Sequence, residues 1–201
     1  MINKKDFSPT VYKFKDSVME SVENSDLFNS YIKTTEFTQL FQGTLWAEGP
    51  CYIPHNDMLI WSDNPNNRML KLFNDQVSEF RNPSNFCNGN TLDNDEYLIS
   101  CSHGGRCIYK IDDNLNVFTL VNNYEGKKLN SPNDVVVKSD GTIWFTDPPY
   151  GIMSNEEGFK SESELAGNFV FKVNSQNNIS IVVDNFDKPI VSISFISHNS
   201  L

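Results

Sequence analysis

Short runs of alternating hydrophobic and polar residues, separated by turn residues, make up the chain from Gly43 onward. Alternation with a period of two residues is typical of strands that bury one face, and no helical period occurs among these runs. The pattern predicts about eleven to twelve short strands and therefore an all-β fold. The nine clearest runs are 58–62, 69–73, 97–101, 106–111, 117–121, 135–137, 142–146, 168–173 and 179–183.

These runs also repeat along the chain. The segment LIWSDNP at residues 59–65 is echoed by IWFTDPP at residues 143–149, with the related LISCS at 98–102 midway. The resulting period is about 42 residues, and four short strands in roughly 40–50 residues are the signature of a β-propeller blade. The competing interpretation is a β-sandwich whose segments are similar by coincidence.

Residues 1–40 differ from the rest and predict an N-terminal extension without a core of its own. The stretch 16–31 has the composition of one or two short helices, with Asp16 and Ser25 as N-cap candidates. The propeller blades are expected over residues 41–188.

Composition narrows the class of partner. The net charge of −10 would repel polyanions, so we expect no nucleic-acid partner. We expect no membrane partner, because no apolar run approaches the roughly 20 residues that cross a bilayer. The N-terminus has no apolar signal region, and the four cysteines, which form no close CxxC pair, are expected to be reduced thiols in the cytoplasm. A bridge between Cys101 and Cys107 across a hairpin is the alternative.

The common catalytic motifs are absent from the sequence. It contains no GxSxG elbow, P-loop, GxGxxG or HExxH. His55, His103 and His198 stand singly among turn residues, as isolated surface histidines do, and nothing favours a Ser-His-Asp triad.

Polar residues at the predicted blade starts are more informative. Glu48 opens the first unit, Asn88 and Asn90 the second, and Asn133 and Asp134 the third. The innermost strand of each blade lines the central channel, so these side chains are expected to converge. Carboxylate and amide oxygens suit a hard divalent cation, chiefly Ca²⁺ or Mg²⁺. The alternative is that the Asn and Asp residues only form turns, a role for which Glu48 is poorly suited.

One long segment resembles a known family. Residues 128–151, KLNSPNDVVVKSDGTIWFTDPPYG, resemble the best-marked stretch of the senescence-marker-protein, gluconolactonase and luciferin-regenerating-enzyme family. Four shorter segments match the same family in the same order: WAEGP at 46–50, WSD at 61–63, RML at 68–70 and NGNTLD at 88–93. The resemblance runs from about Phe37 to Lys188.

The resemblance implies a six-bladed propeller that binds one divalent metal, usually Ca²⁺, and hydrolyses sugar lactones such as gluconolactone. It implies Glu48 as a metal ligand and Asn133 as a residue at the metal or the substrate. Asn88 and Asn90 would lie at the substrate pocket, although the family often has His where Asn90 stands.

The sequence departs from the family near its C-terminus. The family takes further ligands from an Asn of the fourth blade and an Asp of the fifth, which is also its general base. Here residues 190–201 contain no charged residue, so we interpret 189–201 as a non-family tail produced by a frameshift, a retained intron or a gene-model error. We therefore expect an incomplete propeller of about three and a half to four blades, no general-base Asp and impaired activity. The alternatives are a non-catalytic propeller fragment and a calcium-binding regulatory protein; the sequence determines neither the lactone nor the oligomeric state.

Overall fold

The computed structural model describes residues 10–13 and 36–189, and its contacts divide the chain into two units, 1–43 and 44–201. In the first unit, β1 (Thr10–Lys13) pairs antiparallel with β2 (Glu36–Gln39). The helices predicted within 16–31 and residues 190–201 of the predicted tail lie outside the described residues. The domain boundaries drawn from the sequence therefore stay predictions.

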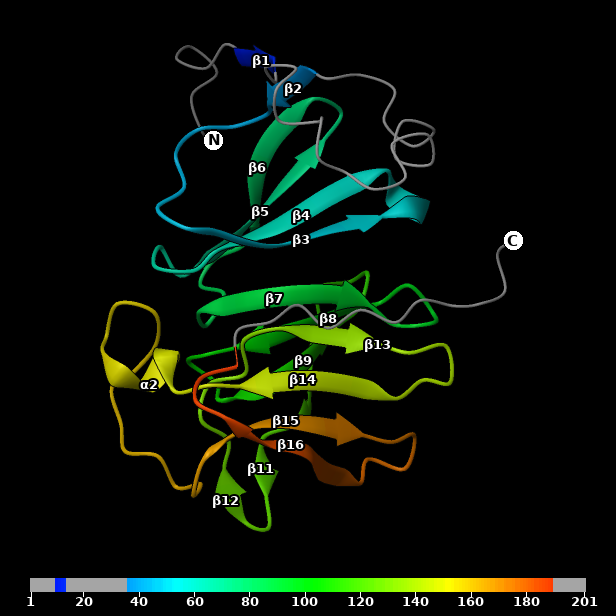
Figure 1. Cartoon of the computed structure of the whole chain (residues 1–201). Coiled ribbons are helices and arrows are strands. Elements are labelled where there is room, and N and C mark those ends of the chain that lie inside the picture. Colours follow the sequence, from blue (N-terminus) through cyan, green and yellow to red (C-terminus); the bar gives the residue numbers. More distant parts are fainter. Residues whose placement is uncertain (1–9, 14–35, 190–201) are drawn as a thin grey trace, which may run out of the picture. The chain divides into compact units, whose positions relative to one another are not determined.

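The second unit is built from four-stranded antiparallel sheets, each with its strands in chain order, as in propeller blades (Figure 1). All nine strand runs predicted from the alternating pattern are strands, which confirms the all-β, propeller-type fold. The first blade comprises β3 (Ala47–Ile53), β4 (Met58–Asp63), β5 (Arg68–Phe73) and β6 (Gln76–Arg81); the second β7 (Cys87–Leu92), β8 (Leu98–Ser102), β9 (Cys107–Ile111) and β10 (Val117–Val121); the third β13 (Val135–Val137), β14 (Ile143–Asp147), β15 (Asn168–Val173) and β16 (Ile179–Phe186).

The part of the chain that the structure describes holds three such blades, fewer than the repeat period predicts. The first blade occupies residues 47–81, whereas the third occupies 135–186. The difference lies in the connection between β14 and β15, which contains the short helix α2 (Tyr150–Met153) and a long loop. In the sequence, a small hairpin of β11 (Asn123–Tyr124) and β12 (Lys127–Lys128) follows the second blade and precedes the third.

Hydrophobic side chains hold neighbouring blades together. One cluster joins the first and second blades, and a second joins the second and third. Successive residues of β8 serve both clusters, since Leu98 packs in one and Ile99 in the other, and every residue of this strand is buried. In the second cluster the rings of Phe145 and Phe171 stack with centroids 5.3 Å apart. Each fully buried side chain of this size contributes about 1.5–3 kcal/mol, so packing between blades is a main source of stability.

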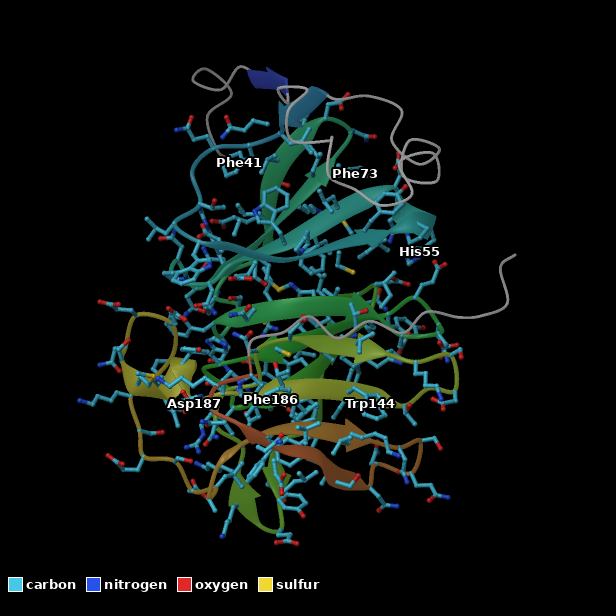
Figure 2. The ribbon with its side chains drawn as sticks, in the orientation of Figure 1. Phe41, His55, Phe73, Trp144, Phe186 and Asp187 are labelled. Atoms are coloured by element: carbon cyan, nitrogen blue, oxygen red, sulfur yellow. The ribbon has the colours of Figure 1, made fainter. Side chains whose placement is uncertain are left out.

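Polar contacts also link the blades at their turns. The 3-10 turn η3 (Pro54–Asn56) follows β3 and carries His55, labelled in Figure 2. The His55 ring lies 2.6 Å from a carboxylate oxygen of Glu96 and 3.2 Å from one of Asp113, both in turns of the second blade. Within the described ranges no helix is long and apolar enough to cross a bilayer.

The innermost strands of the three blades lie side by side in the order β3, β7, β13 (Figure 1). The first two strands have an irregular register near their starts: the shift falls between Glu48 and Cys51 in β3 and between Cys87 and Asn90 in β7. Bulges of this kind redirect side chains and are common next to functional sites. Glu48 and Asn88 lie at these irregular starts, whereas Asn133 lies two residues before β13, which pairs with β14 in a regular register.

Candidate functional site

The structure brings the predicted residues of all three blades together. Glu48 is the second residue of β3, Asn88 is the second residue of β7, and Asn133 lies two residues before β13. All three line a cavity of about 400 Å³, and all three also line a smaller one of about 130 Å³. The convergence expected from the blade repeat is therefore present in the fold.

A glycine allows these strands to approach closely. Gly89, which follows Asn88, donates its backbone N–H to the carbonyl oxygen of Asn133 over 2.8 Å. A Cβ atom at Gly89 would lie 2.5 Å from that oxygen, closer than any side chain tolerates. A Cβ atom at Gly49 would likewise collide with the backbone carbonyl oxygen of Asn88. At both positions a polar residue that lines the cavities is followed by a Gly that lets the next strand approach closely.

The smaller cavity has further walls that sequence reasoning missed. Trp46, Asn64, Tyr150 and Glu157 line it together with the three predicted residues. Tyr150 and Glu157 come from the connection between β14 and β15. Tyr150 belongs to the family-like segment 128–151, and Glu157 lies in the insertion 153–166, which the sequence predicts to be either a loop over the pocket or a solvated surface excursion. Three of the four (Trp46, Asn64 and Tyr150) lie in motifs quoted above, but their common position at one cavity depends on contacts between blades.

Asn64 has one unpaired polar atom. Its side chain is only 2% exposed, and its Nδ2 donates to the backbone carbonyls of Phe86 and Cys87, at 3.2 Å each. Its Oδ1 is buried and has no hydrogen-bond partner. An unpaired buried carbonyl oxygen costs about 1–3 kcal/mol, so a hydrogen-bond donor or a cation next to this oxygen would stabilise the folded protein.

Two carboxylates face the same cavity. Burial raises the pKa of Glu157, and the negative charges of Glu48 and Glu156 raise it further. Repulsion between Glu157 and Glu48 would be relieved by a cation placed between them.

His103 is completely buried, which corrects its assignment to the surface. The ring lies between the loop after α2 and the inner strands: its Nδ1 is 3.0 Å from the carbonyl oxygen of Glu157, and its Nε2 is 3.3 Å from Nδ2 of Asn88 and 3.4 Å from Nδ2 of Asn133. Burial lowers the pKa of His103 to about 4. His55 is partly exposed and His198 lies outside the described residues.

Asn90 is placed differently from Asn88 and Asn133. It lines the larger cavity but not the smaller one. Its Nδ2 lies 2.9 Å from each of three oxygens, of Gly49, Ser62 and Asn88, and its Oδ1 accepts from Ser100 at 2.5 Å. The amide thus ties β7 to the first blade and to β8. Its predicted contact with substrate stays a prediction.

The donor set fits a hard divalent cation. The smaller cavity offers carboxylate oxygens of Glu48 and Glu157 and amide groups of Asn64, Asn88 and Asn133, with Oδ1 of Asn64 already lacking a partner. Oxygen ligands of this kind suit Ca²⁺ and Mg²⁺. Among the described residues no three His, Cys, Asp or Glu side chains gather as a metal site, so amide oxygens would have to complete the coordination.

Comparison with known proteins gives the family. The family model described as the SMP-30/Gluconolactonase/LRE-like region matches residues 46–189, most of the chain. The chain belongs to this family. The resemblance drawn from the sequence motifs is therefore confirmed.

Two relatives within the SMP-30/gluconolactonase/LRE-like family are similar at the sequence level. The gluconolactonase of Zymomonas mobilis subsp. mobilis is 31% identical over 159 residues, which cover 72% of this chain and 44% of that protein. The solved gluconolactonase of Xanthomonas campestris is 36% identical with a TM-score of 0.71, covering 73% of this chain and 50% of that one. The chain thus spans about half the length of these relatives.

A more distant structure shares only the fold. The calcium-binding protein regucalcin of Agrobacterium tumefaciens is 13% identical with a TM-score of 0.55, over 74% of this chain and 46% of that one.

Proposed function

We propose that the described blades form the cation-binding part of a lactonase site that hydrolyses a sugar lactone such as gluconolactone. The observation that carries the proposal is the convergence of Glu48, Asn88 and Asn133, one from the start of each blade, on one pair of cavities. Membership of the gluconolactonase-like family supports the reaction class.

The residues that line the two cavities have different proposed roles. We propose Glu48 and Asn133 as ligands of a divalent cation, most simply Ca²⁺, with the unpaired Oδ1 of Asn64 as a further donor. When bound, such a cation would polarise the lactone carbonyl and stabilise the negative charge that develops on its oxygen. Asn88 and Asn133 would orient the lactone, and Asn90 would keep the wall of the larger cavity in place.

The cavities suit a small ring compound. The larger one, at about 400 Å³, lies within the range of roughly 300–1,000 Å³ that is typical of small-molecule sites. The two further ligands that the family resemblance implies, an Asn of the fourth blade and an Asp of the fifth, are not among the described blades, so we propose weak binding and a rate below that of the Zymomonas mobilis relative.

The experiment uses the purified 201-residue chain. Calcium binding is measured by isothermal titration calorimetry, and gluconolactone hydrolysis is followed above its spontaneous rate with and without EDTA. We expect one calcium site and EDTA-sensitive hydrolysis, slower than that of the Zymomonas mobilis gluconolactonase assayed in parallel.

A matched pair of variants identifies the site. Glu48→Gln removes the charge and should weaken calcium binding at least tenfold and abolish hydrolysis, whereas Glu125→Gln changes an exposed residue of the β11–β12 hairpin and should alter neither. Equal behaviour of wild type and Glu48→Gln would contradict the proposal. Calcium binding without hydrolysis would replace it with the calcium-binding regulatory protein considered above.

We also propose a cytoplasmic location. It is supported by the four cysteines, which are all free thiols in the structure, since oxidising compartments favour disulfides.

A further inference from the structure

His103 contacts two residues of the proposed site through a single atom. Its Nε2 lies 3.3 Å from Nδ2 of Asn88 and 3.4 Å from Nδ2 of Asn133. The two asparagines belong to different blades, and His103, in the turn between β8 and β9, lies where one ring nitrogen serves both.

The other side of the ring determines which nitrogen carries the proton. Nδ1 lies 3.0 Å from the backbone carbonyl oxygen of Glu157, which can only accept a hydrogen bond. Nδ1 must therefore be the donor. The ring is fully buried and hydrogen-bonds no carboxylate among the described residues, so a second proton would leave an unpaired buried charge. Nε2 then holds a lone pair and accepts from the amides.

These hydrogen bonds orient both side-chain amides with Nδ2 toward the imidazole ring. A neutral Nε2 can accept from Nδ2 of Asn88 and Asn133 but would repel their Oδ1 atoms. With Nδ2 held on the ring, Oδ1 points away from it. Neither Oδ1 has a hydrogen-bond partner among the described residues, and neither is a buried unpaired atom. Both are therefore accessible from the cavities that the two residues line.

The ring itself is held in place by the loop connection after β14. Gly151 of α2 packs so closely that a Cβ atom there would collide with the imidazole. Glu157, whose carbonyl accepts from Nδ1, presents its side chain to the same small cavity. The loop therefore fixes the ring, and the ring in turn holds the two amides.

We propose that His103 is a positioning residue that holds the side-chain oxygens of Asn88 and Asn133 toward the cation and substrate. The inference rests on the proposed function for what the oxygens bind, but the amide orientation itself does not depend on it. His103 would contact neither the cation nor the lactone.

Two substitutions separate this role from a structural one. Gln at position 103 can place an oxygen near the position of Nε2 and so accept from the amides, but it loses the donor to Glu157. Asn is shorter and can replace the Nδ1 donor, but it leaves both amides without an acceptor. We expect His103→Asn to weaken calcium binding at least tenfold and His103→Gln to stay within about threefold of wild type.

The reverse order would overturn the proposal. If His103 served only to fix the loop through Glu157, His103→Asn would behave like wild type and His103→Gln would be impaired. Urea unfolding of both variants without calcium reports any loss of stability separately, so a general folding defect is recognised by its effect on the free energy of unfolding.

Nuclear magnetic resonance tests the geometry without cation or substrate. Long-range ¹H–¹⁵N correlation of the calcium-free wild type should show His103 with its proton on Nδ1, and the side-chain NH₂ signals of Asn88 and Asn133 should shift in His103→Asn more than in His103→Gln. A proton on Nε2, or NH₂ signals insensitive to both variants, would refute the positioning role. If the wild type bound no calcium, the proposed function would fail while these signals still decided the role of His103.

Discussion

Gly89 and Asn133 are joined by a backbone hydrogen bond of 2.8 Å at the point where a side chain on the glycine would come within 2.5 Å of the same carbonyl oxygen. The second and third blades therefore meet directly beside the residues that we assign to the site. Any change that separates the two strands also separates Asn88 from Asn133.

Replacing Gly89 with Ala should accordingly affect both stability and the site. The added methyl group has no room and meets backbone atoms, and overpacking of this kind costs about 1–3 kcal/mol in the free energy of unfolding. Urea unfolding measures this loss, and calorimetry should show weaker calcium binding. As a control, Gly126→Ala adds a methyl group that meets nothing within 4 Å, so it should cost only about 1 kcal/mol for its positive φ of 78° and leave calcium affinity unchanged. Equal effects of the two variants would contradict the close-approach argument.

Glu157 should strengthen cation binding through its charge. It lines the smaller cavity, and its pKa is raised by burial and then by the charge of Glu48, so a bound cation would relieve the repulsion between them. We expect Glu157→Gln to raise the calcium dissociation constant about tenfold, which corresponds to about 1.4 kcal/mol. Glu162→Gln, at an exposed position of the same loop, is the control and should bind like wild type. An unchanged dissociation constant in Glu157→Gln would remove this residue from the site.

Asp147 should make stability depend on pH. Burial raises the pKa of Asp147 to about 7, although the backbone N–H groups of Asn130 and Ser131 and the charge of Arg106 act in the opposite direction. Between about pH 4 and pH 7 the folded protein then keeps a proton that the unfolded chain has released, so this group makes stability fall as pH rises. Asp147→Asn removes the titration. From pH 4 to pH 8, the unfolding free energy of the wild type should therefore fall, relative to that of Asp147→Asn, by up to about 4 kcal/mol. A difference independent of pH would show that Asp147 titrates normally.

The four cysteines should resist modification in the folded protein. All are free and buried, and burial raises the pKa of Cys51 and Cys107 to about 11, that of Cys87 to about 12, and that of Cys101 well above its usual range. Because the thiolate is the reactive form, alkylation by iodoacetamide at pH 8 should be at least about a hundredfold slower in the native protein than in urea. Mass spectrometry counts the labelled thiols. Fast labelling of any one of them, or a disulfide between Cys101 and Cys107, would contradict the structure.

The blade architecture and three of the site residues could be predicted from the sequence because they depend on local patterns. Alternation marks a strand wherever one face is buried, and a repeat brings equivalent positions to equivalent places, so Glu48, Asn88 and Asn133 were expected to converge before any contact was known. The inner strand β7 has the polar sequence CNGNTL, in which hydrophobic and polar residues do not alternate. The alternating pattern therefore does not predict this strand, and only the polar residues at its start indicate it.

Only the tertiary structure could assign His103, Asn64 and Glu157. In the sequence His103 is one isolated histidine among turn residues, and its partner carbonyl lies 54 residues away in a loop without a repeat counterpart. Burial and hydrogen-bond partners depend on which segments meet in space, and they determine the tautomer of the ring and the direction of the two amides. The sequence by itself thus determined the strands, the family and the polar residues at the blade starts, because each is a short-range or repeating property. The packing between blades decided how those oxygens are held, because that depends on contacts between residues far apart in the chain.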